Sequence, residues 1–409
     1  MNAMPRLADP VVTVPEVAGL RDTVEALAAI EHRGPCTPGE REAAEWLARR
    51  FGELGTEARI EEERAFASYA GPLLPLLFAG LLAAAAALSG RSRWRAALVA
   101  AAGALGIAED VSNGPRVFRG LVARRRPTWN VVACSGDAAA ERTIVVLAHH
   151  DAAPTGFFFD QTAQRTLARR FPELVERIDT SAPLWWPVVG GPALVAAGAV
   201  LRSRRVLVAG TALTAFSAVG GADVARNRVV PGANDNLSGV AVLVALARAL
   251  RERPVDDLRV LLVSCGSEET LQGGIHGFVA RHATELDSKK TWFLNLDTVG
   301  APRLVMLEGE GPFVMEDYSE PGFRDFVAGV AEGAGVPLRR GMRSRASTDS
   351  VVPSRAGYPV ATFAAVDHEK AIPNYHQLTD TPENLDYDGV AQAALLAEAV
   401  IRELAAAAR

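Results

Sequence analysis

Two histidines and an aspartate end an apolar run in the segment VVLAHHDAAPTG, residues 145–156. The run is typical of a short buried strand, and His149, His150 and Asp151 come where that strand would end. Imidazole and carboxylate groups bind divalent metal ions, but polar residues also commonly end a strand. Residues elsewhere in the chain decide between these two interpretations.

Four further polar clusters follow apolar runs or lie in a loop before the last helix. They are GANDNLSG with Asp235, SEET with Glu268 and Glu269, NLDTVG with Asp297, and NYHQLTDT with Tyr375 and His376. Each has an ordinary interpretation alone, because an aspartate before a helix is usually an N-cap and a histidine is usually structural. Together, imidazoles and carboxylates without thiolates indicate a hydrolytic zinc site with open coordination positions. Two ions bridged by one carboxylate can activate a water and polarise a carbonyl group.

The elements that would position these clusters alternate between strands and helices. Strands are predicted over 130–136, 142–150, 258–265 and 291–297, and helices over 39–55, 236–252, 274–284, 322–335 and 388–408. This alternation predicts an α/β fold with a mixed, mostly parallel central sheet flanked by helices. Sites in such sheets gather at the carboxyl ends of strands, so we expect the clusters to meet there.

Four apolar segments interrupt this pattern, at residues 71–90, 96–108, 182–201 and 206–222. Two of them are uncharged over about 20 residues, the length that spans a bilayer. RSRWR joins the first two and RSRR joins the last two, so each pair is predicted to form an apolar helical hairpin. Their Gly, Ala, Ser and Thr content favours a membrane-embedded four-helix unit. Buried core helices of a soluble protein are the alternative.

Composition and charge argue against several other classes of protein. The formal net charge is −5, with 43 basic and 48 acidic residues, so no basic field indicates a nucleic-acid partner. Cys36, Cys134 and Cys265 lie far apart without CxxC spacing, which argues against a disulfide framework and a cysteine zinc site. Residues 1–20 lack a continuous apolar run behind a basic region, so no signal peptide is expected.

In these motifs the chain resembles the M28 family of zinc metallopeptidases, co-catalytic aminopeptidases. AHHD matches the HxD motif, and GANDNLSGVA, SEET, NLDTVG and YHQLTDT follow in the expected order. Residues 32–47 also resemble the start of the family's N-terminal helix. The resemblance implies one peptidase domain, residues 1–409, interrupted by transmembrane hairpin insertions at 68–122 and 160–226.

The resemblance also implies a set of metal ligands for two zinc ions per chain. His149 and Asp297 would bind one ion, and Glu269 and His376 would bind the second. Asp235 would bridge the two ions.

Three further residues would act around these ligands, again by resemblance. Glu268 would be the general base that takes a proton from the attacking water and passes it to the leaving amine. Asp151 would hydrogen-bond the far nitrogen of His149, and Tyr375 would donate to the developing oxyanion. His150, in the variable position of HxD, is expected to point away from the metal ions.

Two features depart from the family pattern. Asp151 and Asp235, normally about a dozen residues apart, are separated here by the whole second pair of apolar segments. In the stretch 344–363, Ser350 stands where the family commonly has a histidine, which affects contacts in the substrate pocket. Both hairpins would therefore leave and rejoin the body near the site, which predicts substrates presented close to the bilayer.

The sequence thus predicts a zinc-dependent peptidase, most directly an aminopeptidase, acting on peptide or protein substrates. A glutaminyl-cyclase-like enzyme or other amide hydrolase on the same fold is one alternative, and a non-catalytic membrane scaffold is another. The expected location is a membrane, as a multi-pass protein of the cell membrane. Arginines in the hairpin turns favour cytoplasmic turns, whereas Arg124, Arg125 and Arg126 favour the reverse, so both orientations stay open, as does the oligomeric state.

Overall fold

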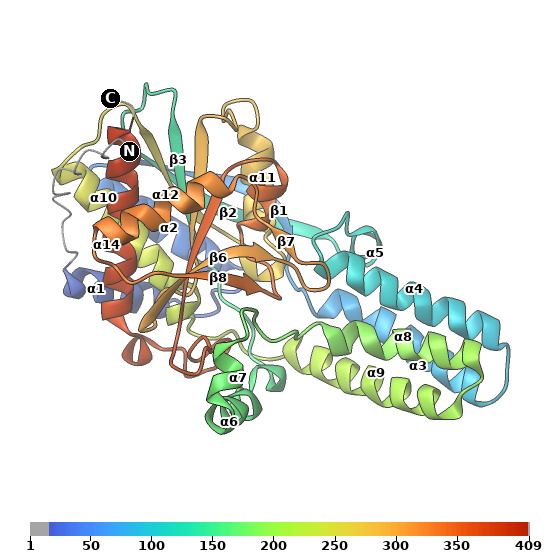
Figure 1. Cartoon of the computed structure of the whole chain (residues 1–409). Coiled ribbons are helices and arrows are strands. Elements are labelled where there is room, and N and C mark those ends of the chain that lie inside the picture. Colours follow the sequence, from blue (N-terminus) through green and yellow to red (C-terminus); the bar gives the residue numbers. More distant parts are fainter. Residues whose placement is uncertain (1–15, 408–409) are drawn as a thin grey trace.

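The computed structural model describes residues 16–407 of the chain. An α/β body and a bundle of four helices make up the molecule, and the bundle projects from one side of the body (Figure 1). Residues 1–15, which hold most of the stretch considered for a signal peptide, lie outside the described residues, as do residues 408–409.

A nine-stranded mixed sheet forms the centre of the body. Its strands are β1 (Glu57–Phe66), β2 (Arg125–Gly136), β3 (Thr143–His149), β4 (Arg259–Cys265), β5 (Thr291–Leu296), β6 (Arg303–Glu310), β7 (Glu316–Asp317), β8 (Arg339–Ser344) and β9 (Val360–Val366). Their order is β1-β2-β4-β3-β5-β9-β6-β7, and β8 pairs with β6. The central strands β4, β3, β5 and β9 run parallel, whereas β2 and β6 join them antiparallel on either side. The predicted α/β fold with a mixed sheet is confirmed, and its longest parallel run is these four central strands.

Helices cover both faces of this sheet. One face packs against α1 (Val17–Ala28), α2 (Pro38–Glu53), α10 (Ser238–Glu252), α12 (Pro321–Gly333) and α14 (Tyr387–Ala406), and the other against α11 (Gly273–His282) and α13 (Val351–Arg355). In β3, Ile144 and Val146 join the first core, while Val145 and Leu147 join the second, because alternate residues of a strand point to opposite faces. Burial on both faces explains the continuous apolar run before His149.

The bundle consists of two helical hairpins whose turns lie at the end farthest from the body (Figure 1). Hairpin 1 is α3 (Leu74–Leu88) with α4 (Arg93–Val111), and hairpin 2 is α8 (Trp186–Leu201) with α9 (Arg204–Val224). Two helical segments, Gly71–Leu88 and Arg204–Val224, are long and apolar enough to cross a membrane by length and composition, and α8 is a shorter apolar helix. Of the four expected spans, these criteria therefore support two.

Small residues fill the interior of the bundle. Ala84 and Ala100 are fully buried between the helices. A Cβ atom added to Gly210 would lie 2.6 Å from the backbone nitrogen of Val195, so α9 approaches α8 closely through this glycine. Large apolar side chains such as Leu82 point outward instead.

The start of the predicted insertion 160–226 belongs to the body rather than to the bundle. It folds into α6 (Thr162–Arg170) and α7 (Pro172–Glu176), which lie beside the body (Figure 1). Arg165 of α6 pairs with Asp367 at 2.7 Å and with Glu369 at 2.9 Å. This segment is thereby tied to the loop that follows β9.

Candidate metal centre

The strand order brings the predicted site residues to one edge of the sheet. His149 is the last residue of β3, and Glu268 and Glu269 lie in a short helix that follows β4. Asp297 follows β5 directly, and Asp235 lies in the turn before α10. Because β4, β3 and β5 are adjacent and parallel, their carboxyl ends meet at the same edge.

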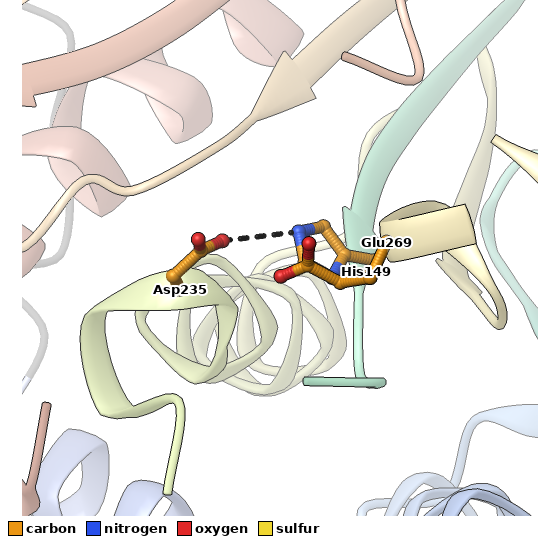
Figure 2. A group of neighbouring side chains, drawn as sticks. All are labelled: His149, Asp235 and Glu269. Carbon is orange, nitrogen blue, oxygen red and sulfur yellow. Dashed lines mark ion pairs between the residues drawn. The ribbon is translucent and has the colours of Figure 1, made fainter. Parts of the chain in front are cut away.

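Carboxylates and imidazoles converge at this edge. The Nε2 atom of His149 lies 3.4 Å from Oδ1 of Asp235 and 3.8 Å from Oε2 of Glu268. The other oxygen of Asp235 lies 3.2 Å from Nε2 of His376, and Oε2 of Glu269 is also 3.2 Å from that nitrogen. Ligand atoms of His149, Asp235 and Glu269 all lie within 4.8 Å of one another, and Figure 2 shows the three side chains pointing inward. Asp235 thus faces both imidazoles.

Asp297 is placed beside this group by its backbone. Its N–H donates to the carbonyl oxygen of Phe363 on β9 at 2.9 Å. Burial and, to a lesser extent, the neighbouring charge of Asp235 raise the pKa of Asp297 to about 8, while His149 opposes the effect. The charges of Asp235 and His149 therefore act on the carboxylate of Asp297. That carboxylate forms no ion pair within residues 16–407.

A family comparison covers most of this site. The model of Peptidase family M28 matches residues 218–401, from the last turns of α9 into α14. The resemblance to family M28 is therefore confirmed over residues 218–401. The matched region includes every predicted M28 ligand except His149, which hairpin 2 separates from the others along the chain.

One curated protein and two solved structures are also similar to this chain. Aminopeptidase YwaD of Bacillus subtilis (strain 168) is 31% identical over 187 residues, which are 42% of this chain and 38% of that protein. The chain therefore matches well under half the length of this curated relative. BSAP, a zinc aminopeptidase from Bacillus subtilis, has a TM-score of 0.56 at 16% identity over 96% of this chain and 96% of that chain. A Fimbriiglobus ruber glutaminyl cyclase has a TM-score of 0.57 at 14% identity over 98% and 99%. These two likenesses show that the body has the zinc-aminopeptidase-like fold.

The hydrogen bond on the far side of His149 fixes which ring nitrogen faces the group. Its Nδ1 lies 3.1 Å from the backbone carbonyl oxygen of Asp151 and 3.5 Å from that residue's carboxylate. A carbonyl oxygen only accepts, so Nδ1 carries a proton and Nε2 is the nitrogen available to bind a metal ion. The sequence predicted that the carboxylate of Asp151 would bind Nδ1 of His149. In the structure the backbone carbonyl oxygen of Asp151 lies nearer to that nitrogen than the carboxylate does.

Two buried aspartates instead hold the backbone of the loops that carry ligands. The carboxylate of Asp151 accepts from the N–H groups of Glu268 at 3.0 Å and Glu269 at 3.1 Å. In the same way, the carboxylate of Asp380 accepts from Asn234 at 2.8 Å and Asp235 at 3.1 Å. Each aspartate satisfies two successive backbone donors and so fixes the direction of the side chains that follow.

The loop between β9 and α14 places Tyr375 and His376 together, with ring centroids 4.0 Å apart. Burial raises the pKa of Tyr375 well above its usual value, and the carboxylates of Asp235 and Glu269 raise it further. Its hydroxyl therefore stays protonated and can donate. His150 faces elsewhere, since its Nδ1 lies 2.9 Å from Oγ of Ser264 on β4, as expected for a residue outside the metal group.

Glu268 has the surroundings of a proton acceptor. Its Oε1 accepts from Nε2 of Gln272 at 2.8 Å, and its Oε2 faces His149. Burial raises the pKa of Glu268 well above its usual value, while the charge of His149 opposes this and that of Asp349 adds to it. A raised pKa makes a carboxylate a better base near neutral pH.

Several buried polar atoms at this edge have no hydrogen-bond partner among residues 16–407. They include Oε1 of Glu269, both ring nitrogens of His376 and both carboxylate oxygens of Asp349. Such atoms are costly to bury, and a cation bound between carboxylates and imidazoles would offset that cost. The donors present therefore fit a zinc ion.

Three acidic residues around the site carried no predicted role. Asp380 lies in the quoted motif NYHQLTDT, four residues after His376. Asp349 precedes the noted Ser350, and burial raises its pKa to about 7. Glu40 opens α2 and accepts from the backbone and the hydroxyl of Ser267, next to Glu268. The sequence could have indicated these residues only through their positions within or next to the family motifs.

Proposed function

We propose that this chain is a zinc-dependent peptidase, and specifically an aminopeptidase, that hydrolyses amide bonds of peptide or protein substrates. The observation that carries the proposal is the meeting of His149, Asp235 and Glu269 within 4.8 Å, beside Glu268. The match of residues 218–401 to the model of family M28 supports this activity, and the relative YwaD is itself named an aminopeptidase. The likeness to solved structures supports the fold alone.

We further propose two zinc ions per chain. His149 and Asp297 would hold the first, Glu269 and His376 would hold the second, and Asp235 would bind both. The support is that the two oxygens of Asp235 face different imidazoles, at 3.4 Å and 3.2 Å. When bound, the ions lower the pKa of a water and polarise the carbonyl of the scissile bond.

The remaining chemistry falls to residues of this chain. Glu268 accepts the proton of the attacking water and delivers it to the leaving amine, while Gln272 holds the carboxylate in place. Tyr375 donates a hydrogen bond to the developing oxyanion. Phe159 and Tyr375 flank His376, with the Phe159 ring centroid 4.4 Å from that of His376.

The variant Glu268→Gln tests this assignment in detergent-solubilised full-length protein. It removes the base and keeps the ligands, so zinc content should match the wild type while turnover of aminoacyl amides falls by about 10²–10⁴-fold. Glu42→Gln, at an exposed position of α2, is the matched control and should retain full activity.

A set of peptide substrates distinguishes an aminopeptidase from a glutaminyl-cyclase-like enzyme and from a non-catalytic scaffold. N-blocked peptides should resist cleavage if the enzyme requires a free amine, and an N-terminal glutaminyl peptide should lose its terminal residue. Cyclisation of that glutamine with release of ammonia would instead mark a glutaminyl-cyclase-like enzyme. Zinc-free protein with no turnover of any substrate would mark a scaffold.

We also propose that the bundle spans a bilayer, as a multi-pass unit of the cell membrane. The 21 residues of α9 extend about 31 Å at about 1.5 Å per residue, close to the roughly 30 Å of a hydrocarbon core. Trp94 lies beside the turn of hairpin 1, and the rings of Tyr69 and Trp185 meet at 6.0 Å where the bundle joins the body. Aromatic residues at both ends are typical of membrane interfaces.

Two measurements test the membrane proposal. The full-length chain should resist carbonate extraction from membranes, and release into the soluble fraction would contradict the proposal. Labelling of Arg95→Cys with an impermeant maleimide, compared with the labelling of the wild type through its native cysteines, then decides which side of the membrane carries the turns. The active site lies on the opposite side.

A further inference from the structure

Each hairpin is attached to a loop of the candidate metal centre. Residues 112–116, here called the exit loop, follow α4 of hairpin 1 and lie against the loop that carries Glu268. Residues Phe157–Phe159, here called the Phe segment, precede hairpin 2 and lie against the loop that carries His376. The bundle is therefore linked to both halves of the site, through the exit loop and through the Phe segment.

The exit loop reaches Glu268 through Arg116. The buried guanidinium of Arg116 donates to the carbonyl oxygen of Leu271 at 2.5 Å and also to the side chain of Asn113. Leu271 and Gln272 have φ of 69° and 57°, a left-handed conformation that is unfavourable for residues other than glycine and needs contacts to hold it. Gln272 in turn donates to Oε1 of Glu268 at 2.8 Å. One chain of contacts thus runs from hairpin 1 to the proposed base.

The exit loop is itself anchored to the body. Arg355 of α13 donates to the carbonyl oxygens of Asn113 at 2.9 Å and Ser112 at 3.0 Å. Gln272 also donates to the carbonyl oxygen of Ser347 at 3.0 Å, in the segment that precedes α13. Arg116 therefore sits at a junction of hairpin 1, α13 and the Glu268 loop.

The Phe segment makes the corresponding link for hairpin 2. The ring of Phe158 packs against Phe216 of α9 at 5.1 Å, and the ring of Phe159 packs against His376 at 4.4 Å. Gln377, the residue after His376, donates from its side chain to the carbonyl oxygen of Phe159 at 2.9 Å. An aromatic path thus joins α9 to a proposed zinc ligand.

We propose that the bundle is a positioning element of the active site, in addition to crossing the membrane. Arg116 orients Glu268 through Leu271 and Gln272, and Phe159 holds the ring of His376. The proposal rests on the proposed function, and it assigns positioning roles to residues contributed by or next to the two insertions. Activity then depends on how the bundle is seated on the body.

Kinetics of Arg116 variants provide the first test, in the full-length chain. Arg116→Ala should lower kcat by at least about tenfold, with KM within about threefold and zinc content unchanged, because it misplaces a group that acts in the transition state. Arg116→Lys keeps one donor toward Leu271 and should restore part of the loss. Arg95→Ala, at an exposed position in the first turn of α4 in the same hairpin, is the matched control. Equal kcat in Arg116→Ala, Arg116→Lys and Arg95→Ala would overturn the proposal.

A double variant tests the route. If Arg116 acts through Gln272, the combination of Arg116→Ala with Gln272→Ala should lower kcat little further than the more damaging single variant. Multiplication of the two single effects would overturn this route.

Hydrogen exchange tests positioning without any turnover. The N–H groups of Gln272 and Gly273 are bonded to the carbonyl oxygens of Glu268 and Ser267, and Arg116→Ala should speed their exchange. Phe159→Ala should do the same for the N–H of Gln377, and the exposed bundle residue Phe78→Ala is its control. Absence of peptide hydrolysis in the wild type would refute the proposed function alone, whereas unchanged exchange in both variants would refute the positioning role.

Discussion

The body and the bundle bury opposite kinds of side chain. Phe51, Phe293 and Phe363 are fully buried in the body, as expected where large apolar groups leave water. In the bundle, alanines such as Ala84 are buried, while Leu82 is 73% exposed. Small residues inside and large apolar residues outside are the arrangement that close helix packing in lipid favours. The two regions thus pack differently, which agrees with the proposed bilayer location of the bundle.

The body also buries a cluster of charged side chains. At the edge of the sheet, the body buries Asp235, Glu268 and Glu269 next to two imidazoles. Such a concentration of buried carboxylates lowers stability unless cations or donors compensate for it. We therefore attribute this cluster to chemistry, and the predictions below test each side of the contrast.

Loss of Asp235 should have the largest effect. Asp235→Ala removes the carboxylate that faces both imidazoles, so peptidase activity should fall by at least about a thousandfold, equivalent to the several kcal/mol that the bound ions contribute. Zinc content should fall with it, as measured by elemental analysis. Asp22→Ala, an exposed aspartate of α1, serves as the control. Activity near the wild-type level in Asp235→Ala would separate the cluster from catalysis.

A large-to-small change should destabilise the body. Phe293→Ala removes a fully buried ring of β5 and should lower the free energy of unfolding by about 3–5 kcal/mol. Thermal unfolding in detergent provides the measurement. A loss below about 1 kcal/mol would show that the body tolerates cavities as a loosely packed core does.

Asp380 tests whether buried charge in the body serves to hold ligand loops. Asp380→Ala leaves the N–H groups of Asn234 and Asp235 without their acceptor, so zinc affinity should fall by about 10–100-fold. Competition with a chelator measures the affinity, and the exposed Asp388→Ala is the comparison. Equal affinities in the two variants would assign Asp380 to folding alone.

The smallest effects on stability should appear in the bundle. There, enlarging a buried side chain should destabilise the protein more than shortening an exposed one. Ala84→Leu overfills the buried interior and should lower stability by about 1–3 kcal/mol. Leu82→Ala, at an exposed position of the same helix, should change stability by no more than about 0.5 kcal/mol. The opposite ranking of these two variants would mean that the bundle packs as a soluble core does.

The fold was predictable from the sequence where local pattern suffices. The apolar run before His149 marks β3 because that strand is buried on both faces and so lacks alternation. By contrast, β1 and β8 carry several charged residues, and long-range pairing with β2 and β6 forms them. Their residues contain no comparable local signal.

The site was predictable in its residue types but only in part in its contacts. Motif resemblance named the ligands, and the structure brings His149, Asp235, Glu268, Glu269 and His376 together. The roles of Asp380 and Arg116 depend on hydrogen bonds to backbone atoms more than a hundred residues away. Such contacts follow from the folded arrangement and have no local sequence pattern.

Zinc content tests the central claim most directly. Full-length protein, purified without chelators and measured by elemental analysis, should hold about two zinc ions per chain. Glu268→Gln should hold the same amount, and Asp235→Ala should hold far less. Near-zero zinc in wild-type protein that still cleaves peptides in the presence of a chelator would contradict the account.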